Sequence, residues 1–451
     1  MDTKIQNTKR ELTPEEKKER NTLIYSLLLT LLLCLLGGGN TAVTFIALLG
    51  YIPLLLRPEC LIGPVLFTSV FDDYILITAG QSLGRYVALF FIVGVLMKIM
   101  FAKKRIKIDF WFVITVVITA SAVILSFFGI KGYTGFPTTF FFYLLFFFCM
   151  LNCPISSRKV LVDQIWWFTI LTLAYSAWFL LQNGLSAFEE GRVGKFEDAV
   201  NANQMAIGLA MLAASLVAHF LINNFKQKTI HITLILATVF LTFLTGSRTS
   251  LIAILLSSVI IFLYWLKLNS GKFGTALLII ILSAVLLYGI YQFLVARFPI
   301  LMDRFTVDNV VESGASGRID VWKAFLTEYF PDYWMFGIGF NTKNLFHAVT
   351  DVNGIGHGAH NIIIDILASS GIFGLFLYFS LFVKTSKEVK ISAKKDCSAL
   401  LPFAMLVCII FTGIGENVIR GRLFWFSIAL CIIFTILINK EKTNAEEQKN
   451  D

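Results

Sequence analysis

The chain has 451 residues, of which 57% are hydrophobic and 15% charged, and its mean hydropathy is +0.76. A soluble globular protein carries about 25% charged residues, so this composition excludes one and indicates an integral membrane protein. The net charge of +9 does not indicate nucleic acid binding, because Lys and Arg gather at the ends of apolar runs, where they orient membrane spans.

Long apolar runs recur along most of the chain and approach the ~20 residues that a helix needs to cross a bilayer. They predict an all-α, polytopic transmembrane bundle of about 12 to 14 spans. The expected spans are 23–36, 41–56, 86–102, 109–130, 138–152, 164–183, 203–223, 230–245, 249–266, 273–295, 360–383, 397–415 and 422–438.

The basic loops, among them Lys384 to Lys395, mark the cytoplasmic side. With the sides assigned, the chain is predicted to have five parts. Residues 1–21 and 439–451 are expected to be cytoplasmic tails. Spans fill 22–296 and 360–438, and 297–359 forms one large extracytoplasmic loop with short amphipathic helices. The alternation of sides requires a further crossing within 60–83, which we expect to be broken or tilted because Asp72 and Asp73 lie at its centre.

Motifs for several chemistries are absent from the sequence. It has no Gly-x4-Gly-Lys-Ser/Thr loop, no HExxH and no Gly-x-Gly-x-x-Gly, so nothing supports ATP hydrolysis, zinc proteolysis or dinucleotide binding. Cys149 and Cys153 have no second Cys or His pair beside them, so they do not indicate a metal site. We therefore expect no metal and no cofactor.

Four polar stretches fall on the predicted outer face, at 194–204, 246–248, 297–359 and 416–422. Arg248 stands in a Gly-Ser-Arg turn squeezed between two apolar runs, which fixes it at the membrane edge. It is either a ligand for an anion or an interfacial anchor whose apolar stem lies along the bilayer.

Arg318 follows Ser316-Gly317, and the apolar residues after it recur every three or four positions, which predicts an amphipathic helix in the interface. Ser316 would cap that helix and place Arg318 in its first turn, where backbone N–H groups favour phosphate. The alternative is a solvated arginine on the polar side of the helix.

His360 begins the apolar run towards 376 and is expected at the membrane surface above a helix. A neutral imidazole there can accept the proton of an attacking hydroxyl, and the alternative is a histidine that only makes interfacial hydrogen bonds. His357 is a weaker candidate.

Two guanidinium groups and an imidazole on one lipid-adjacent surface suit a lipid-linked pyrophosphate. Arginines clamp phosphate oxygens through paired hydrogen bonds and can stabilise the charge of a departing pyrophosphate. The predicted reaction is the transfer of a glycan from a lipid diphosphate carrier to a sugar hydroxyl, with His360 as general base.

The ordered set of motifs resembles the O-antigen ligase and O-antigen polymerase superfamily of bacterial membrane glycosyltransferases. The residues that carry the resemblance are Gly246-Ser247-Arg248, Ser316-Gly317-Arg318 with Trp322, Gly337-Ile338-Gly339, and His360-Asn361 followed by Gly371-Ile372-Phe373-Gly374.

The resemblance implies a metal-independent, inverting glycosyltransferase that acts on undecaprenyl diphosphate-linked oligosaccharide. Arg248 and Arg318 then match the pyrophosphate-binding arginines and His360 the catalytic histidine. His357, Asn361, Trp322 and Asn203 are further candidates for substrate binding.

The resemblance also implies a multi-pass protein of the bacterial cytoplasmic membrane whose active site faces outward. Membrane lipid, a polysaccharide flippase and a chain-length regulator are the expected partners. Within the superfamily we favour a polymerase of surface polysaccharide repeat units, with a ligase that moves finished polymer to an acceptor as the alternative. A transporter is the competing class, but transporters place ionisable residues near the midplane, whereas these charges lie at span ends.

Overall fold

The computed structural model describes the greater part of the chain. The described residues are 14–36, 41–71, 75–78, 81–102, 106–128, 138–155, 157–182, 202–223, 228–269, 318–340, 359–419 and 421–450, with a few isolated positions between 274 and 306. Within them the fold is helical apart from one short hairpin, β1 (Leu76–Thr78) and β2 (Gln81–Ser82). The predicted all-α membrane bundle is confirmed.

Seven described helices are long and apolar enough to cross a membrane. They are α1 (Pro14–Leu36), α4 (Leu83–Ala102), α7 (Arg158–Gln182), α9 (Ala202–Ile222), α11 (Arg248–Leu268), α18 (Ile362–Lys395) and α20 (Arg422–Asn450). Shorter apolar helices are α2 (Thr41–Leu48) with η1 (Leu49–Leu56), η2 (Pro58–Leu61) with α3 (Ile62–Val70), α5 (Phe110–Phe128), α6 (Thr138–Asn152), α10 (Lys228–Leu244), and η5 (Cys397–Ala399) with α19 (Leu400–Thr412). Helices form because an apolar surrounding offers no partner to backbone polar groups, which must bond within their own segment.

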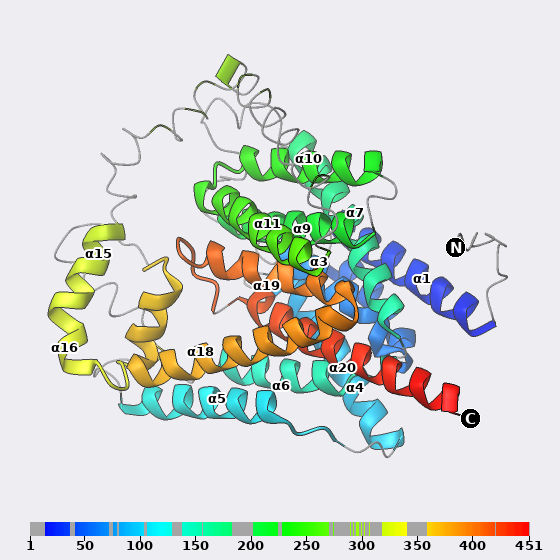
Figure 1. The fold of residues 1–451 in the computed structure, drawn as a ribbon, viewed down its shortest axis with the longest axis horizontal. Coiled ribbons are helices and arrows are strands. Elements are labelled where there is room, and N and C mark those ends of the chain that lie inside the picture. The colour runs from blue at the N-terminus through cyan, green and yellow to red at the C-terminus, as the bar shows by residue number, and fades with distance from the viewer. Residues whose placement is uncertain are drawn as a thin grey trace.

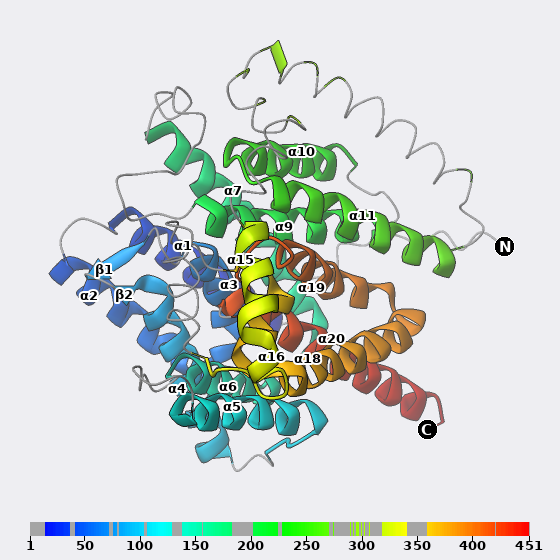
Figure 2. The same cartoon turned by 90° about the vertical axis from the view of Figure 1, so that its left-hand side faces the viewer.

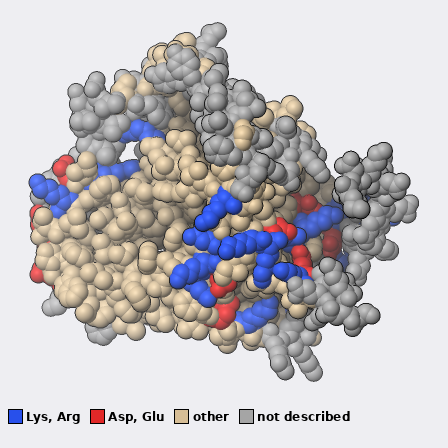
Figure 3. Space-filling model, in the orientation of Figure 1, with Lys and Arg blue, Asp and Glu red and all other residues tan. Residues whose placement is uncertain are grey.

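The centre of the bundle is built from α9, α19 and α20. Most of the apolar stretches of α9 and α20 are buried, at 78% and 83%, whereas α1 and α11 bury only 28% of theirs. The helices run roughly along one direction (Figure 1), and α9, α11 and α19 pack against one another. Much of the face seen in Figure 3 carries no charged side chain, and a large group of Lys and Arg lies towards the end where α20 finishes.

The described residues of the segment 60–83 do not form one continuous helix: they comprise the end of η2, the helix α3 and the hairpin β1–β2, and α3 lies inside the bundle. Every residue of α3 is buried, and the helix packs against α7 and α4. Gln164 of α7 supplies hydrogen bonds to the backbone groups at the break before α3. Its side chain accepts from the Gly63 N–H at 2.8 Å and donates to the Glu59 carbonyl at 2.6 Å. Irregular backbone at membrane depth is tolerated where protein supplies such partners. Asp72 and Asp73 lie outside the described residues.

The basic stretch from Lys384 to Lys395, expected as a loop, is helical. It continues α18 without interruption, and residues 439–450, expected as a tail, continue α20. These stretches hold no Gly or Pro and together are rich in Lys and Glu, which favour helix. The Lys384–Glu388 pair at 2.8 Å also supports the α18 extension.

One helical arm crosses an end of the bundle. It consists of α15 (Arg318–Ala324), the π-helical turn η4 (Phe325–Tyr329) and α16 (Phe330–Tyr333). Figures 1 and 2 show this arm lying across the ends of the long helices, on the side away from the C-terminal end of α20. The arm belongs to the predicted large loop, of which 307–317 and 341–358 lie outside the described residues, as does most of the expected span 273–295.

Candidate functional site

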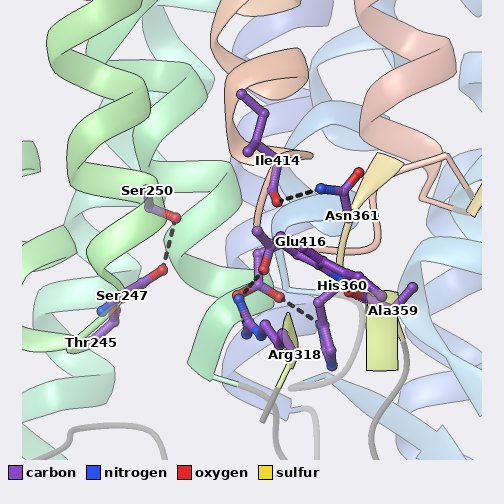
Figure 4. A network of polar contacts seen from close by, with 11 residues as sticks. Thr245, Ser247, Ser250, Arg318, Ala359, His360, Asn361, Ile414 and Glu416 are labelled. Carbon is purple, nitrogen blue, oxygen red and sulfur yellow. Dashed lines mark hydrogen bonds and ion pairs between the residues drawn. The ribbon is translucent and has the colours of Figure 1, made fainter. Parts of the chain in front are cut away.

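Arg318 and His360 meet at one carboxylate, that of Glu416. The guanidinium of Arg318 donates to the Gly415 carbonyl at 2.5 Å and lies 3.5 Å from a carboxylate oxygen of Glu416. The Nδ1 atom of His360 lies 3.3 Å from the other carboxylate oxygen. Figure 4 shows the three side chains converging from α15, the start of α18 and the turn between α19 and α20.

The three side chains differ in burial. The Glu416 side chain is 5% exposed, whereas those of Arg318 and His360 are 20% and 26% exposed. Burying a carboxylate is costly unless cations or hydrogen bonds compensate it, and the two partners supply that compensation. The acid is therefore covered, and the guanidinium and imidazole keep surface that a ligand can reach.

Glu416 also decides which nitrogen of His360 is available. An ionised carboxylate can only accept hydrogen bonds, so Nδ1 carries the proton when it bonds to Glu416. The Nε2 atom then presents its lone pair. A histidine in this tautomer can take a proton from a hydroxyl group, and its partner can stabilise the resulting imidazolium.

The backbone of His360 is held in a left-handed conformation, with φ of 46°. A non-glycine residue adopts this conformation at a cost, and it persists where the surroundings impose it. Two backbone groups beside it are fixed: the Trp322 indole N–H donates to the Ala359 carbonyl at 2.6 Å, and the Ile362 N–H donates to the Gly413 carbonyl at 2.6 Å. The position of the imidazole is thus set by the arm and by the end of α19.

Asn361 caps α18, which begins at Ile362. Its side-chain oxygen accepts from the N–H groups of Ile363 at 2.9 Å and Ile364 at 3.2 Å, and its amide nitrogen donates to the Ile414 carbonyl at 3.3 Å. Asn is among the best residues for this position, because it satisfies N–H groups that have no partner within the helix. Asn361, expected as a substrate ligand, therefore has its side chain engaged in structure.

The helix α18 is interrupted at Gly371, where φ is 63°, and residues 334–339 fill the break. Four backbone hydrogen bonds of 2.8 to 3.1 Å join the two segments, from Ile338 to Ala368, Gly339 to Ser369, Ile372 to Trp334 and Phe373 to Met335. A Cβ atom at Gly337 or Gly371 would collide with the opposing backbone. The Gly337-Ile338-Gly339 and Gly371 motifs thus join the arm to α18.

A small hydrophobic cluster completes that joint. Its buried members are Val321, Phe325, Ile338, Ala359, Ile364 and Ala368. They come from the arm, the Gly337-Ile338-Gly339 turn and the first turns of α18, so Arg318 and His360 are carried by one packed unit. The π-helical turn adds a residue to the arm just where Phe325 enters this cluster.

Arg248 is the first residue of α11, and Gly246 before it has φ of 68°. Ser247 and Ser250 bond to each other at 3.0 Å in the first turn (Figure 4). A Cβ atom at Gly415 would collide with Thr249, so the start of α11 lies against the turn that carries Glu416. The structure thus brings Arg318 and His360 together on Glu416. Arg248 is the residue before Thr249, which lies against the turn that carries Glu416.

Three other candidates have different positions. Trp322 uses its indole N–H on the Ala359 carbonyl. Asn203 lies half-buried in the first turn of α9. His357 lies outside the described residues.

Glu416 was not assigned a role from the sequence, although it begins one of the four polar stretches. The available signal was a carboxylate in a short turn between two apolar runs, on the face predicted to hold the arginines. In the described part of the chain no three His, Cys, Asp or Glu side chains form a group suited to a metal ion. Glu416 and His360 together offer two possible ligands, one fewer than such a group needs.

The fold and this site define a multi-pass membrane protein with an Arg–Glu–His group at one end of its bundle. Residues 232–379 match the O-antigen ligase family, a range that includes Arg248, Arg318 and His360 and ends before Glu416. The match covers about a third of the chain, and it supports the resemblance to the O-antigen ligase and O-antigen polymerase superfamily and a ligase or polymerase type of enzyme. No curated protein matches the chain.

Proposed function

We propose that the protein transfers glycan from an undecaprenyl diphosphate-linked donor to a sugar hydroxyl and so polymerises the repeat units of a surface polysaccharide. The observation that carries this proposal is the convergence of Arg318 and His360 on the buried carboxylate of Glu416. It combines an anion-binding group with a proton acceptor, which is what displacement of a pyrophosphate by a hydroxyl requires.

Arg318 and Arg248 would bind the pyrophosphate. The hydrogen bond to the Gly415 carbonyl and the Glu416 ion pair orient the Arg318 fork, which has five N–H donors in all. The remaining donors can pair with phosphate oxygens, and Arg248 would approach from the start of α11. Both charges stabilise the diphosphate as it leaves.

His360 would act as general base. The acceptor hydroxyl loses its proton to Nε2 while its oxygen forms a bond to the anomeric carbon, and the bond from that carbon to the phosphate oxygen breaks. Lipid diphosphate leaves with the electron pair of that bond. A single displacement of this kind inverts the anomeric configuration. Glu416, on Nδ1, stabilises the imidazolium.

The site is proposed to face outward from the bacterial cytoplasmic membrane. The arm lies across one end of the bundle, and the lysine-rich end of α18 and the end of α20 lie away from it (Figure 1). Lys-rich segments favour the cytoplasmic side. Lipid-linked donors delivered by a flippase would reach this face, and a chain-length regulator would act beside it.

Substitution tests the site. Arg248→Ala, Arg318→Ala and His360→Ala should each lower polymer formation from lipid-linked repeat units by about 100-fold or more. Lys323→Ala, on the exposed side of the same arm, is the matched control and should leave activity unchanged. Normal polymer from all three site variants, at equal membrane abundance, would refute the proposal.

A chelator tests whether the arginines act without a metal ion. Guanidinium groups can supply the charge stabilisation that a divalent ion supplies elsewhere. We expect purified protein to retain its activity in EDTA. Loss of activity that returns on adding a divalent ion would contradict the arginine-only account.

The second candidate is an O-antigen ligase, the description of the matching family. A ligase would use the same donor site and transfer finished polymer to another acceptor. The lipid-linked material in a deletion strain distinguishes the two. Single repeat units on the carrier indicate a lost polymerase, and long chains on the carrier indicate a lost ligase.

A further inference from the structure

The last third of α18 extends past the membrane core. Beyond its interruption at Gly371, α18 runs for the 24 residues of Ile372–Lys395, about 36 Å at ~1.5 Å each, whereas the hydrocarbon core is about 30 Å thick. A charged side chain is costly inside the hydrocarbon core, so the core is expected to end where the charged residues begin. Lys384 is the first charged residue after Asp365. Residues 384–395 therefore lie at the level of lipid headgroups.

This end of α18 has two faces. Thr385, Val389, Ser392 and Ala393 are buried against the bundle. Four exposed residues follow each other on the other face at helical spacing, and they define the lysine stripe: Lys387, Lys390, Ile391 and Lys394. Residues three or four positions apart are neighbours on a helix, so the three ammonium groups form one row with an apolar side chain among them.

The acidic groups nearby are engaged elsewhere. Glu388 pairs with Lys384 at 2.8 Å, and Asp396 and Glu441 both pair with Arg158. In the part of the chain that the structure describes, none of the ion pairs involves a lysine of the stripe. The positive charge of the stripe is therefore not neutralised by these acids.

Other bases extend the same surface. Tyr264 of α11 donates to the Lys390 carbonyl at 3.3 Å, and Lys267 follows one turn later with its side chain exposed. On the other side, Lys395 donates to Asn439 of α20 at 2.7 Å, next to the exposed Lys440. Figure 3 shows Lys and Arg gathered on this side of the molecule.

We propose that the lysine stripe binds the headgroups of anionic phospholipids. Its height on α18, its row of ammonium groups and the exposed Ile391 fit a membrane surface, where the apolar side chain can enter the acyl boundary while the lysines meet phosphate. This site is separate from the proposed transfer reaction and does not depend on it.

The test uses the purified full chain and a pair of charge-matched variants. The stripe variant is Lys387→Gln with Lys390→Gln and Lys394→Gln. The control is Lys17→Gln with Lys18→Gln and Arg20→Gln, three exposed bases on α1 whose charge is offset by Glu15, Glu16 and Glu19 in the same stretch of sequence. Native mass spectrometry measures phosphatidylglycerol against phosphatidylcholine retained from an equimolar mixture.

We expect the unsubstituted protein to retain more phosphatidylglycerol, and the stripe variant to lose this preference by about tenfold or more, since each lysine near an anionic surface contributes about fivefold. The control should keep most of it. About 1 M salt should abolish the preference, because the Debye length is then ~3 Å.

Two outcomes would overturn the proposal. A stripe variant that keeps the preference of the unsubstituted protein would show that these lysines do not bind lipid and would leave an acidic protein segment as their partner. Equal losses in the stripe and control variants would show a response to total charge only. Thermal unfolding of the stripe variant checks its fold, which we expect to be unchanged because all three side chains are exposed.

Discussion

Each end of the bundle holds an arginine paired with one or more carboxylates. The two groups differ in how deeply their carboxylates are buried. At the arm, the Glu416 side chain is 5% exposed, and both partners keep reachable surface. At the opposite end, Arg158 joins Asp396 and Glu441, whose side chains are 36% and 40% exposed. There the acids face solvent, and Arg158 also donates to Ser398 at 2.9 Å, so that group connects α7, α18 and α20.

The comparison indicates how a structural ion pair differs from one suited to chemistry. A solvent-exposed pair contributes about 1 kcal/mol or less and fastens elements together. A buried carboxylate depends on its partners, and it in turn fixes their orientation and charge. We expect changes at the Glu416 end to affect catalysis and changes at the Arg158 end to affect stability.

The largest difference should come from the carboxylates. Glu416→Gln keeps the size of the side chain but removes the charge that orients Arg318 and supports His360. We expect kcat to fall by about 100-fold or more. Asp396→Asn, at the other end, should leave kcat unchanged. Activity assays on both variants, normalised to the amount of folded protein, measure the difference. Equal activities would contradict the catalytic role of Glu416.

The next effect concerns the geometry of the cations. Arg318→Lys keeps the charge but replaces a planar fork with a point charge, so we expect activity to fall by about 10-fold or more. Arg158→Lys should retain near-normal activity. Full activity of Arg318→Lys would show that charge attraction alone suffices, and a donor titration separates weaker binding from slower transfer.

A smaller effect should follow loss of the bond that holds the backbone before His360. Trp322→Phe removes the indole N–H that Ala359 accepts and keeps an aromatic ring in place. One hydrogen bond contributes about 1 kcal/mol, so we expect kcat to fall by about 5-fold while KM for the donor stays the same. A raised KM with unchanged kcat would instead favour the substrate-binding role that the sequence suggested.

The smallest effect concerns how the stability contributed by the Arg158–Asp396 pair changes at low pH. Burial by itself would raise the pKa of Asp396, but hydrogen bonds from Arg158 and Ser398 and the Arg158 charge outweigh it and hold the pKa below its usual value. The resulting stabilisation is present above the unfolded pKa of ~3.9 and is lost as pH falls through the lower folded value.

Asp396→Asn should therefore lower the unfolding free energy by about 1 kcal/mol or less at neutral pH, and the difference should shrink in acid. Thermal unfolding at several pH values measures it. A difference that grows as the pH falls would contradict this account.

The sequence predicted the class of fold because hydropathy alone specifies membrane helices. It also singled out Arg318 and His360, because both stand at the start of predicted helices on the outer face, where they can meet an anion or a hydroxyl group. It could not show that Glu416 joins them, because that contact links residues 98 and 56 positions apart. The bond from the Ile362 N–H to the Gly413 carbonyl, between the start of α18 and the end of α19, helps to bring the turn to the arm.

The Gly337-Ile338-Gly339 and Gly371 motifs were visible in the sequence, but their function was not. Glycine at both positions indicates unusual backbone, yet the partner of each backbone is set by tertiary contact. The same limit applies to Asn361 and Trp322, whose polar atoms could serve either a ligand or the protein. The extension of α18 to Lys395 was missed because a basic stretch after an apolar run was interpreted as a loop.

The interruption of α18 at Gly371 has a consequence for how the protein tolerates different membranes. A long helix adjusts to bilayer thickness by tilting, and most of α18 lies in the segment Ile372–Lys395, after the interruption. The nine residues before the interruption are attached to the arm by backbone bonds and by the small cluster around Phe325. Ile372 and Phe373 are bonded to the arm as well, so we expect the second segment to change its tilt beyond Phe373 while the break itself stays fixed to the arm.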